Sequence, residues 1–285
     1  MDISTRLACK RVLITGAARG IGAALAQRLH ERGARVALVG LEEKRLEAIA
    51  RSCGNAHWKV CDVSDRDDLR AAVETSVDAL GGLDVVVANA GIAAQLPLAG
   101  GEPEVMDRII SVNVLGVYNT IWAGAPHVSH TNGYVVLVSS FAAAVHLPLM
   151  GAYSASKAAV EALGNTLRVE LRPWGAKVGV AYFAELDTDV TRRGYDTRAS
   201  RALPSSKWIG HGRPLDLGID ALERGIARRS RRIIAPRWMT GALPFRMAIQ
   251  PVIERVTQPG LAKALEIARE EQVALTTAQP DENDD

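Results

Sequence analysis

Seven short apolar runs recur along the first 236 residues of the chain, and longer stretches with helical spacing separate most of them. The runs are RVLIT (11–15), RVALV (35–39), HWKVC (57–61), DVVVA (84–88), YVVLVS (134–139), KVGVAY (177–182) and RRIIA (231–235). The stretches between them include 21–32, 65–80 and 153–171. Near-continuous apolar strands joined by helices predict a parallel sheet with helices on both faces, because right-handed crossovers place helices above and below it.

This alternation predicts a single α/β domain over residues 1–236, since the sequence contains no internal repeat and no low-complexity linker. Within that domain, residues 190–215 mix charge, glycine and proline, which is typical of a mobile segment at the substrate side of a sheet. Residues 237–285 place prolines among apolar residues, followed by the helical pattern LAKALEIAREEQVAL. We therefore expect a helical C-terminal extension that packs on the domain, with its last residues disordered.

The composition narrows the class of protein. With 34 basic and 32 acidic side chains and 48% hydrophobic residues, the chain lacks the charge bias of a nucleic-acid-binding protein. It has no uninterrupted run of about 18 apolar residues, and the arginines at 228–232 fit a solvated strand edge better than a lipid contact, so membrane contact is not expected. Its three cysteines have no metal-ligand spacing, which predicts no metal site and reduced thiols in the cytoplasm.

A glycine-rich loop, TGAARGIG (15–22), joins the first apolar run to the following helix. Glycine at positions 16, 20 and 22 allows a tight turn and a close approach to the helix N-terminus, where free N–H groups favour a pyrophosphate. The spacing is G-x-x-x-G-x-G rather than the common G-x-G-x-x-G, and a plain strand-to-helix turn is the alternative.

Two further strand ends carry candidate binding residues. Asp62 follows the third run and is placed to accept a hydrogen bond from an adenine amino group, although a helix N-cap or a turn carboxylate would explain it as well. The fourth run leads into Asn89, Ala90 and Gly91, whose small size would let a ribose pass close to the backbone. A tight turn is the alternative there.

The segment GAYSASKAAV (151–160) places Tyr153 and Lys157 on one helix face, because residues four apart are neighbours on a helix. A free tyrosine has a pKa of about 10 and is a weak acid at neutral pH. A lysine ammonium one turn away favours the phenolate, so we expect Lys157 to lower the pKa of Tyr153 and make it an acid/base. In isolation such a pair would more often be a solvated helix face.

Taken with Asn113 in SVNVLG and Ser140 at the end of VSS, these motifs resemble the short-chain dehydrogenase/reductase family over roughly residues 8–236. The resemblance implies a Rossmann-type sheet with strand order 3-2-1-4-5-6-7 and a nicotinamide dinucleotide at the carboxyl ends of the strands. It also implies a catalytic tetrad of Asn113, Ser140, Tyr153 and Lys157. Ser140 would hydrogen-bond the substrate oxygen, and Asn113 would hold a water that links Lys157 to solvent.

The cofactor residues that the resemblance implies come from many parts of the chain. They are Gly16, Arg19, Gly20, Ile21, Gly22, Leu41, Asp62, Val63, Asn89, Ala90, Gly91, Tyr153, Lys157 and Thr188. No acid stands at position 40 and Arg19 resembles the basic residue of NADP-preferring members, which favours NADP, whereas Glu42 favours NAD. Phe183-Ala184 stand where the family usually has Pro-Gly, so the path of the loop to Thr188 is left open.

The substrate is less clearly encoded. Phe141, Leu147 and Phe183 predict an apolar pocket for a lipophilic alcohol or ketone, or an alcohol and aldehyde pair, with ordinary loop packing as the alternative. The resemblance also implies a homodimer or homotetramer. A catalytically silent dinucleotide-binding regulatory or assembly protein of the same fold is the alternative function.

Overall fold

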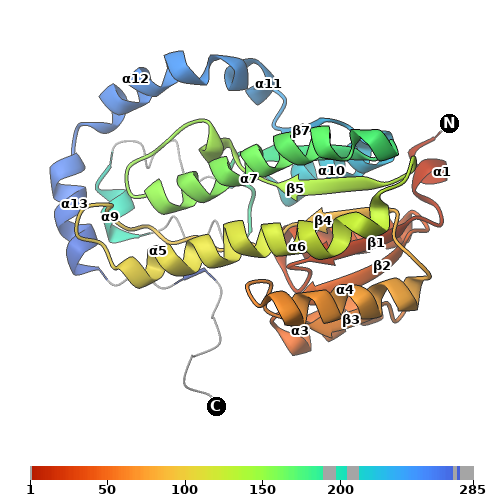
Figure 1. The fold of residues 1–285 in the computed structure, drawn as a ribbon. Coiled ribbons are helices and arrows are strands. Elements are labelled where there is room, and N and C mark those ends of the chain that lie inside the picture. Colours follow the sequence, from red (N-terminus) through yellow and green to blue (C-terminus); the bar gives the residue numbers. More distant parts are fainter. Residues whose placement is uncertain (1, 189–196, 204–211, 272–274, 277–285) are drawn as a thin grey trace.

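The computed structural model describes residues 2–188, 197–203, 212–271 and 275–276, and its centre is one sheet of seven parallel strands (Figure 1). The strands are β1 (Arg11–Thr15), β2 (Arg35–Gly40), β3 (His57–Val60), β4 (Val85–Ala88), β5 (Tyr134–Val138), β6 (Lys177–Phe183) and β7 (Arg232–Ala235). Their order is β3-β2-β1-β4-β5-β6-β7, which confirms the predicted topology. Each strand lies within one residue of the run that predicted it.

Helices cover both faces of the sheet. They are α1 (Ile3–Leu7), α2 (Gly20–Glu31), α3 (Glu43–Ser52), α4 (Arg66–Leu80), α5 (Pro103–Ile110), α6 (Gly116–Gly124), α7 (Gly151–Glu170), α9 (Arg198–Arg201), α10 (Leu215–Arg228), α11 (Met239–Ala242), α12 (Arg246–Thr257) and α13 (Leu261–Glu270). Side chains alternate along a strand, so Val12 and Ile14 of β1 join the core under α2, α3 and α10, whereas Leu13 joins the core under α4, α6 and α7.

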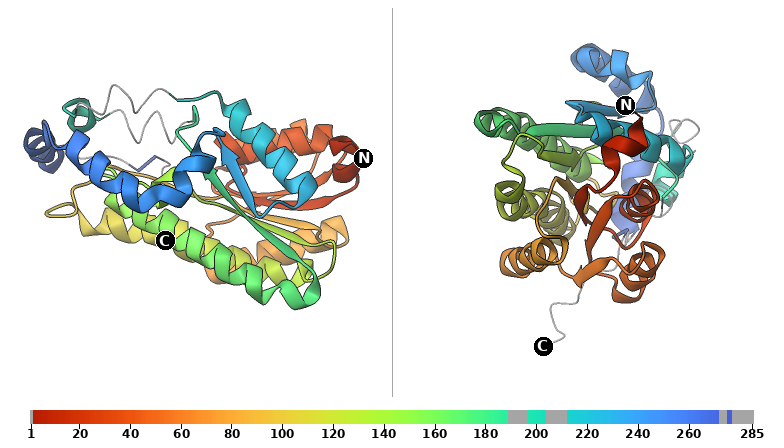
Figure 2. Two further views of the ribbon diagram at one scale, coloured as in Figure 1. Left: turned by 90° about the horizontal axis from the view of Figure 1, so that it is seen from above. Right: turned by 90° about the vertical axis from the view of Figure 1, so that its right-hand side faces the viewer.

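The chain continues beyond β7 into α11, α12 and α13, which confirms a helical C-terminal region. These helices follow an arc around one end of the molecule, and α13 lies beside α9 at the end opposite the N-terminus (Figures 1 and 2). Of the predicted mobile segment 190–215, residues 190–196 and 204–211 lie outside the described residues, as do the C-terminal residues expected to be disordered. In the described part of the chain, none of the helices is both long and apolar enough to cross a bilayer.

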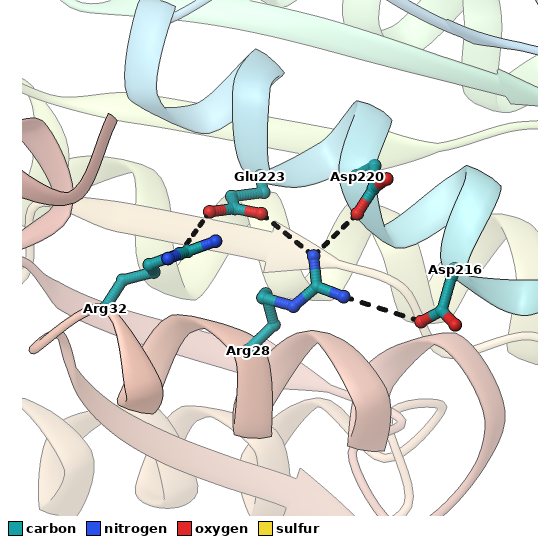
Figure 3. A network of polar contacts seen from close by, with 5 residues as sticks. All are labelled: Arg28, Arg32, Asp216, Asp220 and Glu223. Carbon is teal, nitrogen blue, oxygen red and sulfur yellow. Dashed lines mark hydrogen bonds and ion pairs between the residues drawn. The ribbon is translucent and has the colours of Figure 1, made fainter. Parts of the chain in front are cut away.

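A network of charges joins α2 to α10 on one face of the sheet (Figure 3). Arg28 donates to Asp220 at 2.6 Å and to Glu223 at 2.9 Å, and its second nitrogen lies 3.5 Å from Asp216. Arg32 donates to the other oxygen of Glu223 at 2.5 Å. The Glu223 side chain is only 6% exposed, whereas that of Asp216 is 83% exposed. The network therefore has one buried carboxylate that depends on both arginines.

The difference in burial predicts different costs for removing these two carboxylates. Glu223→Ala removes the buried carboxylate that Arg28 and Arg32 share, so Arg32 loses this hydrogen bond while Arg28 keeps the one to Asp220, and we expect it to lower the free energy of unfolding by about 2 kcal/mol. Asp216→Ala, the matched control, removes a solvated partner and should change it by less than about 0.5 kcal/mol. Urea unfolding followed by circular dichroism measures both values. Equal effects of the two substitutions would contradict this account of the network.

Candidate active site

A cavity of about 890 Å³ lies at the carboxyl ends of the strands and brings most of the predicted site residues together. Those that line it are Gly16, Arg19, Gly20, Ile21, Leu41, Asp62, Val63, Asn89, Ala90, Gly91, Ser140, Phe141, Leu147, Tyr153, Lys157, Phe183 and Thr188. Gly22 and Asn113 are not part of the lining, and Asn113 is fully buried behind it.

The glycine turn between β1 and α2 has the shape that close approach of a ligand requires. Gly16 and Gly20 have φ angles of +65° and +54°, which side chains disfavour. A Cβ on Gly22 would lie 2.2 Å from the carbonyl oxygen of Gly16 and 2.7 Å from Nδ2 of Asn89, so only glycine fits there. Because α2 begins at Gly20, its first N–H groups lie at the cavity, and the turn fits a dinucleotide pyrophosphate.

The end of β4 is tied to the end of β1. Nδ2 of Asn89 donates to the carbonyl oxygens of Thr15 at 3.0 Å and Gly16 at 3.2 Å. The backbone N–H of Asn89 donates to Oγ1 of Thr15 at 3.1 Å. Asn89 thus fixes the glycine turn. The ribose contact expected of Asn89, Ala90 and Gly91 remains a separate prediction.

The carboxylate of Asp62 is engaged within the protein. One oxygen accepts from the backbone and hydroxyl of Ser64, at 2.9 and 2.7 Å, and the other accepts from Arg108 at 2.6 Å. These hydrogen bonds outweigh burial and hold the pKa of Asp62 below its usual value. The turn-carboxylate alternative describes these contacts, while the adenine contact remains a prediction.

At the end of β2, Glu42 forms an ion pair with Arg19 of the glycine loop through two hydrogen bonds. Arg45 approaches the same carboxylate at 3.3 Å. The sequence set Arg19 and Glu42 against each other as opposing signals for the cofactor, but it did not predict that they bind one another. Both residues line the cavity, so each partly neutralises the charge with which the other would meet a ligand.

Asn113 lies in a π-helical turn, Ser111–Leu115, that joins α5 to α6. Such turns often mark functional sites. Its Oδ1 accepts from the N–H of Ile92 at 2.8 Å, and its Nδ2 donates to the carbonyl of Ile92 at 2.9 Å and to Ser156 at 3.0 Å. Asn113 therefore fixes the segment after β4 and contacts the helix that carries Tyr153 and Lys157.

Tyr153, Lys157 and Ser140 converge at the cavity. The Lys157 ammonium lies 5.5 Å from the centre of the Tyr153 ring and donates to the carbonyl of Val138, at the end of β5, at 3.0 Å. The hydroxyl of Ser140 lies close enough to the Tyr153 phenol to affect its pKa, and it donates to the carbonyl of Phe183 at 3.4 Å. Ser140 also accepts from the N–H of Ala142 at 3.1 Å, which holds its oxygen at the cavity.

The pKa of Tyr153 differs from the expectation that Lys157 would lower it. Burial raises the pKa of Tyr153 to about 12, and the nearby Ser140 hydroxyl opposes this only in part. Burial also lowers the pKa of Lys157 to about 8. Removal from water disfavours the charged form of both groups.

The substrate side of the cavity contains residues that the sequence did not identify. Phe141, Leu147 and Phe183 line it as predicted positions, and Trp238 and Ile253 of the C-terminal extension join them. The rings of Phe141 and Trp238 meet edge to face with centres 5.4 Å apart. No local spacing links position 141 to position 238, so only the tertiary fold reveals this wall. The described residues contain no cluster of His, Cys, Asp and Glu suited to a metal ion.

The sequence of the chain is similar to a known protein family and to individual known proteins. Residues 10–199 match the family described as short chain dehydrogenase. An uncharacterized oxidoreductase of Listeria innocua is 33% identical over 188 residues, which cover 64% of this chain and 76% of that protein. The 11-beta-hydroxysteroid dehydrogenase-like 2 of Arabidopsis thaliana is 31% identical over 237 residues, which cover 81% and 74%.

Solved structures resemble the chain as well. A short-chain dehydrogenase from Burkholderia cenocepacia in complex with NADP has a TM-score of 0.71 and 30% identity, and the match covers 80% of this chain and 97% of that one. A protein from Burkholderia phymatum in complex with NAD has a TM-score of 0.76 over 89% and 97% of the two chains. Its 23% identity supports the fold alone.

The lowered pKa of Lys157 predicts a pH dependence of stability. The unfolded lysine binds its proton up to a pKa near 10.5, but the folded one only to about 8. Between these values the unfolded state holds more protons, so stability increases as pH rises from about 8 to about 10.5 and falls as pH drops back through that range. Relative to Lys157→Met, we expect the wild-type free energy of unfolding to gain about 2 kcal/mol from about pH 7 to about pH 10. Urea unfolding at each pH measures the difference, and a difference independent of pH would refute the shift.

Proposed function

The chain belongs to the short-chain dehydrogenase family, and on that premise we propose that it is an NAD(P)-dependent oxidoreductase that interconverts a secondary alcohol and a ketone, or an alcohol and an aldehyde. The observation that carries the proposal is the convergence of Tyr153, Ser140 and Lys157 on one cavity that also contains the glycine turn. The predicted substrate is small to medium in size and lipophilic.

In this proposal, some residues of the chain bind the cofactor and others transfer the proton. When bound, the nicotinamide supplies or accepts the hydride and, in its oxidised form, adds a positive charge beside the phenol. Gly16, Gly20 and the start of α2 would hold the pyrophosphate. Tyr153 donates a proton to the substrate oxygen in reduction and accepts it in oxidation, and Ser140 orients that oxygen by a hydrogen bond.

Lys157 and Asn113 complete the proposed proton path. With a pKa near 8, Lys157 exchanges its proton at neutral pH more readily than an ordinary lysine. A Cβ on Gly91 would lie 3.3 Å from both Nζ of Lys157 and Oδ1 of Asn113. The absence of a side chain at position 91 therefore leaves room between the end of β4 and the ammonium of Lys157. A water near Asn113 would link Lys157 to solvent, as the family resemblance implies.

An apolar wall supports the lipophilic substrate. Phe141, Leu147 and Phe183 face the cavity together with Trp238 and Ile253, and neither wall residue from the extension carries charge. A substrate that buries a hydrocarbon body against this wall would direct its single polar oxygen toward Ser140 and Tyr153.

Exposed apolar residues and free cysteines support the proposed oligomeric state and cellular compartment. On and near α6, Leu115, Tyr118 and Trp122 are 48%, 41% and 42% exposed, and they give the proposed homodimer or homotetramer an apolar face on which to form. The three cysteines are free, which is in keeping with action in the reducing cytoplasm.

The cofactor is NADP or NAD, and the Arg19–Glu42 pair governs the choice. The Glu42 carboxylate neutralises Arg19 and repels a 2′-phosphate, while it can accept a hydrogen bond from a ribose 2′-OH. In this arrangement Arg19 favours binding of NADP and Glu42 favours binding of NAD, so the two effects oppose each other. This explains why the sequence contains a feature typical of each cofactor.

We expect Glu42→Gln to shift binding toward NADPH, because the repulsion is lost and Arg19 keeps its charge. The ratio of the dissociation constants of NADPH and NADH should fall about tenfold, which corresponds to about 1.4 kcal/mol. Fluorescence titration with the two reduced cofactors measures the ratio without requiring turnover. Glu43→Gln, which alters the exposed neighbouring carboxylate, is the control. An equal shift in both variants would assign the effect to net charge rather than to the ion pair.

We expect Tyr153→Phe to reduce turnover of an alcohol and carbonyl panel by a factor of about 10²–10⁴, the usual worth of a general acid. Binding of the reduced cofactor should stay within about threefold, since the phenol oxygen is not part of the glycine turn. Tyr118→Phe, an exposed tyrosine on α6, should retain full activity. Wild-type protein that binds a cofactor but turns over no member of the panel would favour the catalytically silent alternative.

A further inference from the structure

The C-terminal strap, defined as residues 237–271 with Leu275 and Thr276, passes over the substrate side of the cavity. It leaves the sheet after β7, runs through α11 and α12, and turns along α9 as α13 (Figure 1). Trp238 and Ile253 of the strap line the cavity. The strap also makes three sets of hydrogen bonds with the backbone of segments that bound the site.

The first contact holds the segment between Ser140 and Tyr153. Oε1 of Gln250, on α12, accepts from the backbone N–H of His146 at 3.0 Å, and its Nε2 donates to the carbonyl of His146 at 3.2 Å. His146 precedes the cavity residue Leu147. One amide side chain thus satisfies both polar groups of one residue, which fixes the path of the backbone there.

The second contact holds α9. The Glu271 carboxylate accepts from the N–H groups of Arg198 and Ala199 at 2.9 and 3.0 Å. An apolar cluster continues this contact, because α9 and α13 bury Ala199, Leu203, Ala264 and Ala268 against Leu149. Leu149 precedes Met150, a cavity residue at the start of the helix that carries Tyr153.

The third contact reaches the segment that Asn113 holds. Thr276 is fully buried, its Oγ1 accepts from the N–H of Ala93 at 3.0 Å, and its own N–H donates to the carbonyl of Ala93 at 3.1 Å. The adjacent Ile92 gives both of its backbone groups to Asn113. Residues 92–97 are buried but form neither helix nor strand, so their polar groups need such external partners.

From these contacts we propose that the strap is a positioning element of the active site, in which Gln250, Glu271 and Thr276 hold the backbone that shapes the substrate pocket. The inference rests on the proposed function and assigns its substrate selectivity to the extension. The three residues act through backbone that they hold and do not touch the reacting atoms. Because one net hydrogen bond contributes modestly to stability, single substitutions should loosen the pocket without unfolding the chain.

Two substitutions remove these hydrogen bonds at nearly constant shape. Thr276→Val and Gln250→Leu should each raise the KM for the best substrate of the panel about fivefold, with kcat changed less than about threefold, which is the ratio expected for one hydrogen bond. Amide hydrogen exchange should accelerate about fivefold at Ala93 in Thr276→Val and at His146 in Gln250→Leu. The dissociation constant of the reduced cofactor should not change.

Matched variants separate positioning from general loss of stability. Thr276→Ser keeps the hydroxyl and should restore both KM and exchange at Ala93. Thr257→Val removes a buried hydroxyl of α12 that bonds only carbonyls of its own helix, Ile253 and Glu254, and should leave KM unchanged. Unchanged exchange at both amides, or an equal rise of KM in Thr257→Val, would overturn the proposal. If the wild type turns over no substrate, the proposed function fails, and hydrogen exchange still decides whether the strap holds these segments.

Discussion

The parallel alignment of the strands is the constraint on which the site depends. Parallel strands bring their carboxyl ends to one edge, so the turn after β1, Asn89 after β4 and Ser140 after β5 meet there although they are far apart in sequence. Close packing then fixes their relative positions. A Cβ on Gly22 would collide with the carbonyl of Gly16, and Asn89 binds that same carbonyl, so the glycine turn and the end of β4 form one unit. A ligand at this edge meets a preformed surface, which lowers the ordering cost of binding.

The pKa values of Lys157 and Tyr153 depend more on burial than on pairing. Lys157 is 4% exposed and binds the carbonyl of Val138, so its ammonium faces protein rather than water. Burial shifts the pKa values of Lys157 and Tyr153 in opposite directions, to about 8 and about 12, and each shift favours the neutral form. A positive charge close to the phenol would oppose this effect and favour the phenolate. The simple expectation that a nearby lysine lowers the pKa of the tyrosine omits the desolvation that both groups share.

Local patterns in the sequence were sufficient to predict the strands, their order through the family resemblance, and the glycine turn. Each depends on residues close in sequence: apolar runs such as 134–139, or the spacing of Gly16, Gly20 and Gly22. The interactions that could not be predicted join residues far apart. Glu42 binds Arg19 across 23 positions, and Trp238 packs against Phe141 in one wall of the cavity although the two lie far apart in sequence. A residue type indicates what a side chain can bind, but only the packed fold determines which partner it finds.

The C-terminal strap illustrates why a catalytic domain of this kind benefits from additional chain. Residues 92–97 are buried without regular structure, and burying unpaired backbone groups is costly. Asn113 satisfies Ile92 from within the domain, whereas Ala93 is satisfied by Thr276, 183 residues away. Gln250 binds both backbone groups of His146, which is exposed, so this contact holds the path of the backbone rather than offsetting burial. The strap thus supplies hydrogen-bond partners at segments beside the cavity, and a change in the strap can alter the pocket while the glycine turn and Tyr153 stay unchanged. The two proposals together therefore assign selectivity and chemistry to different parts of one chain.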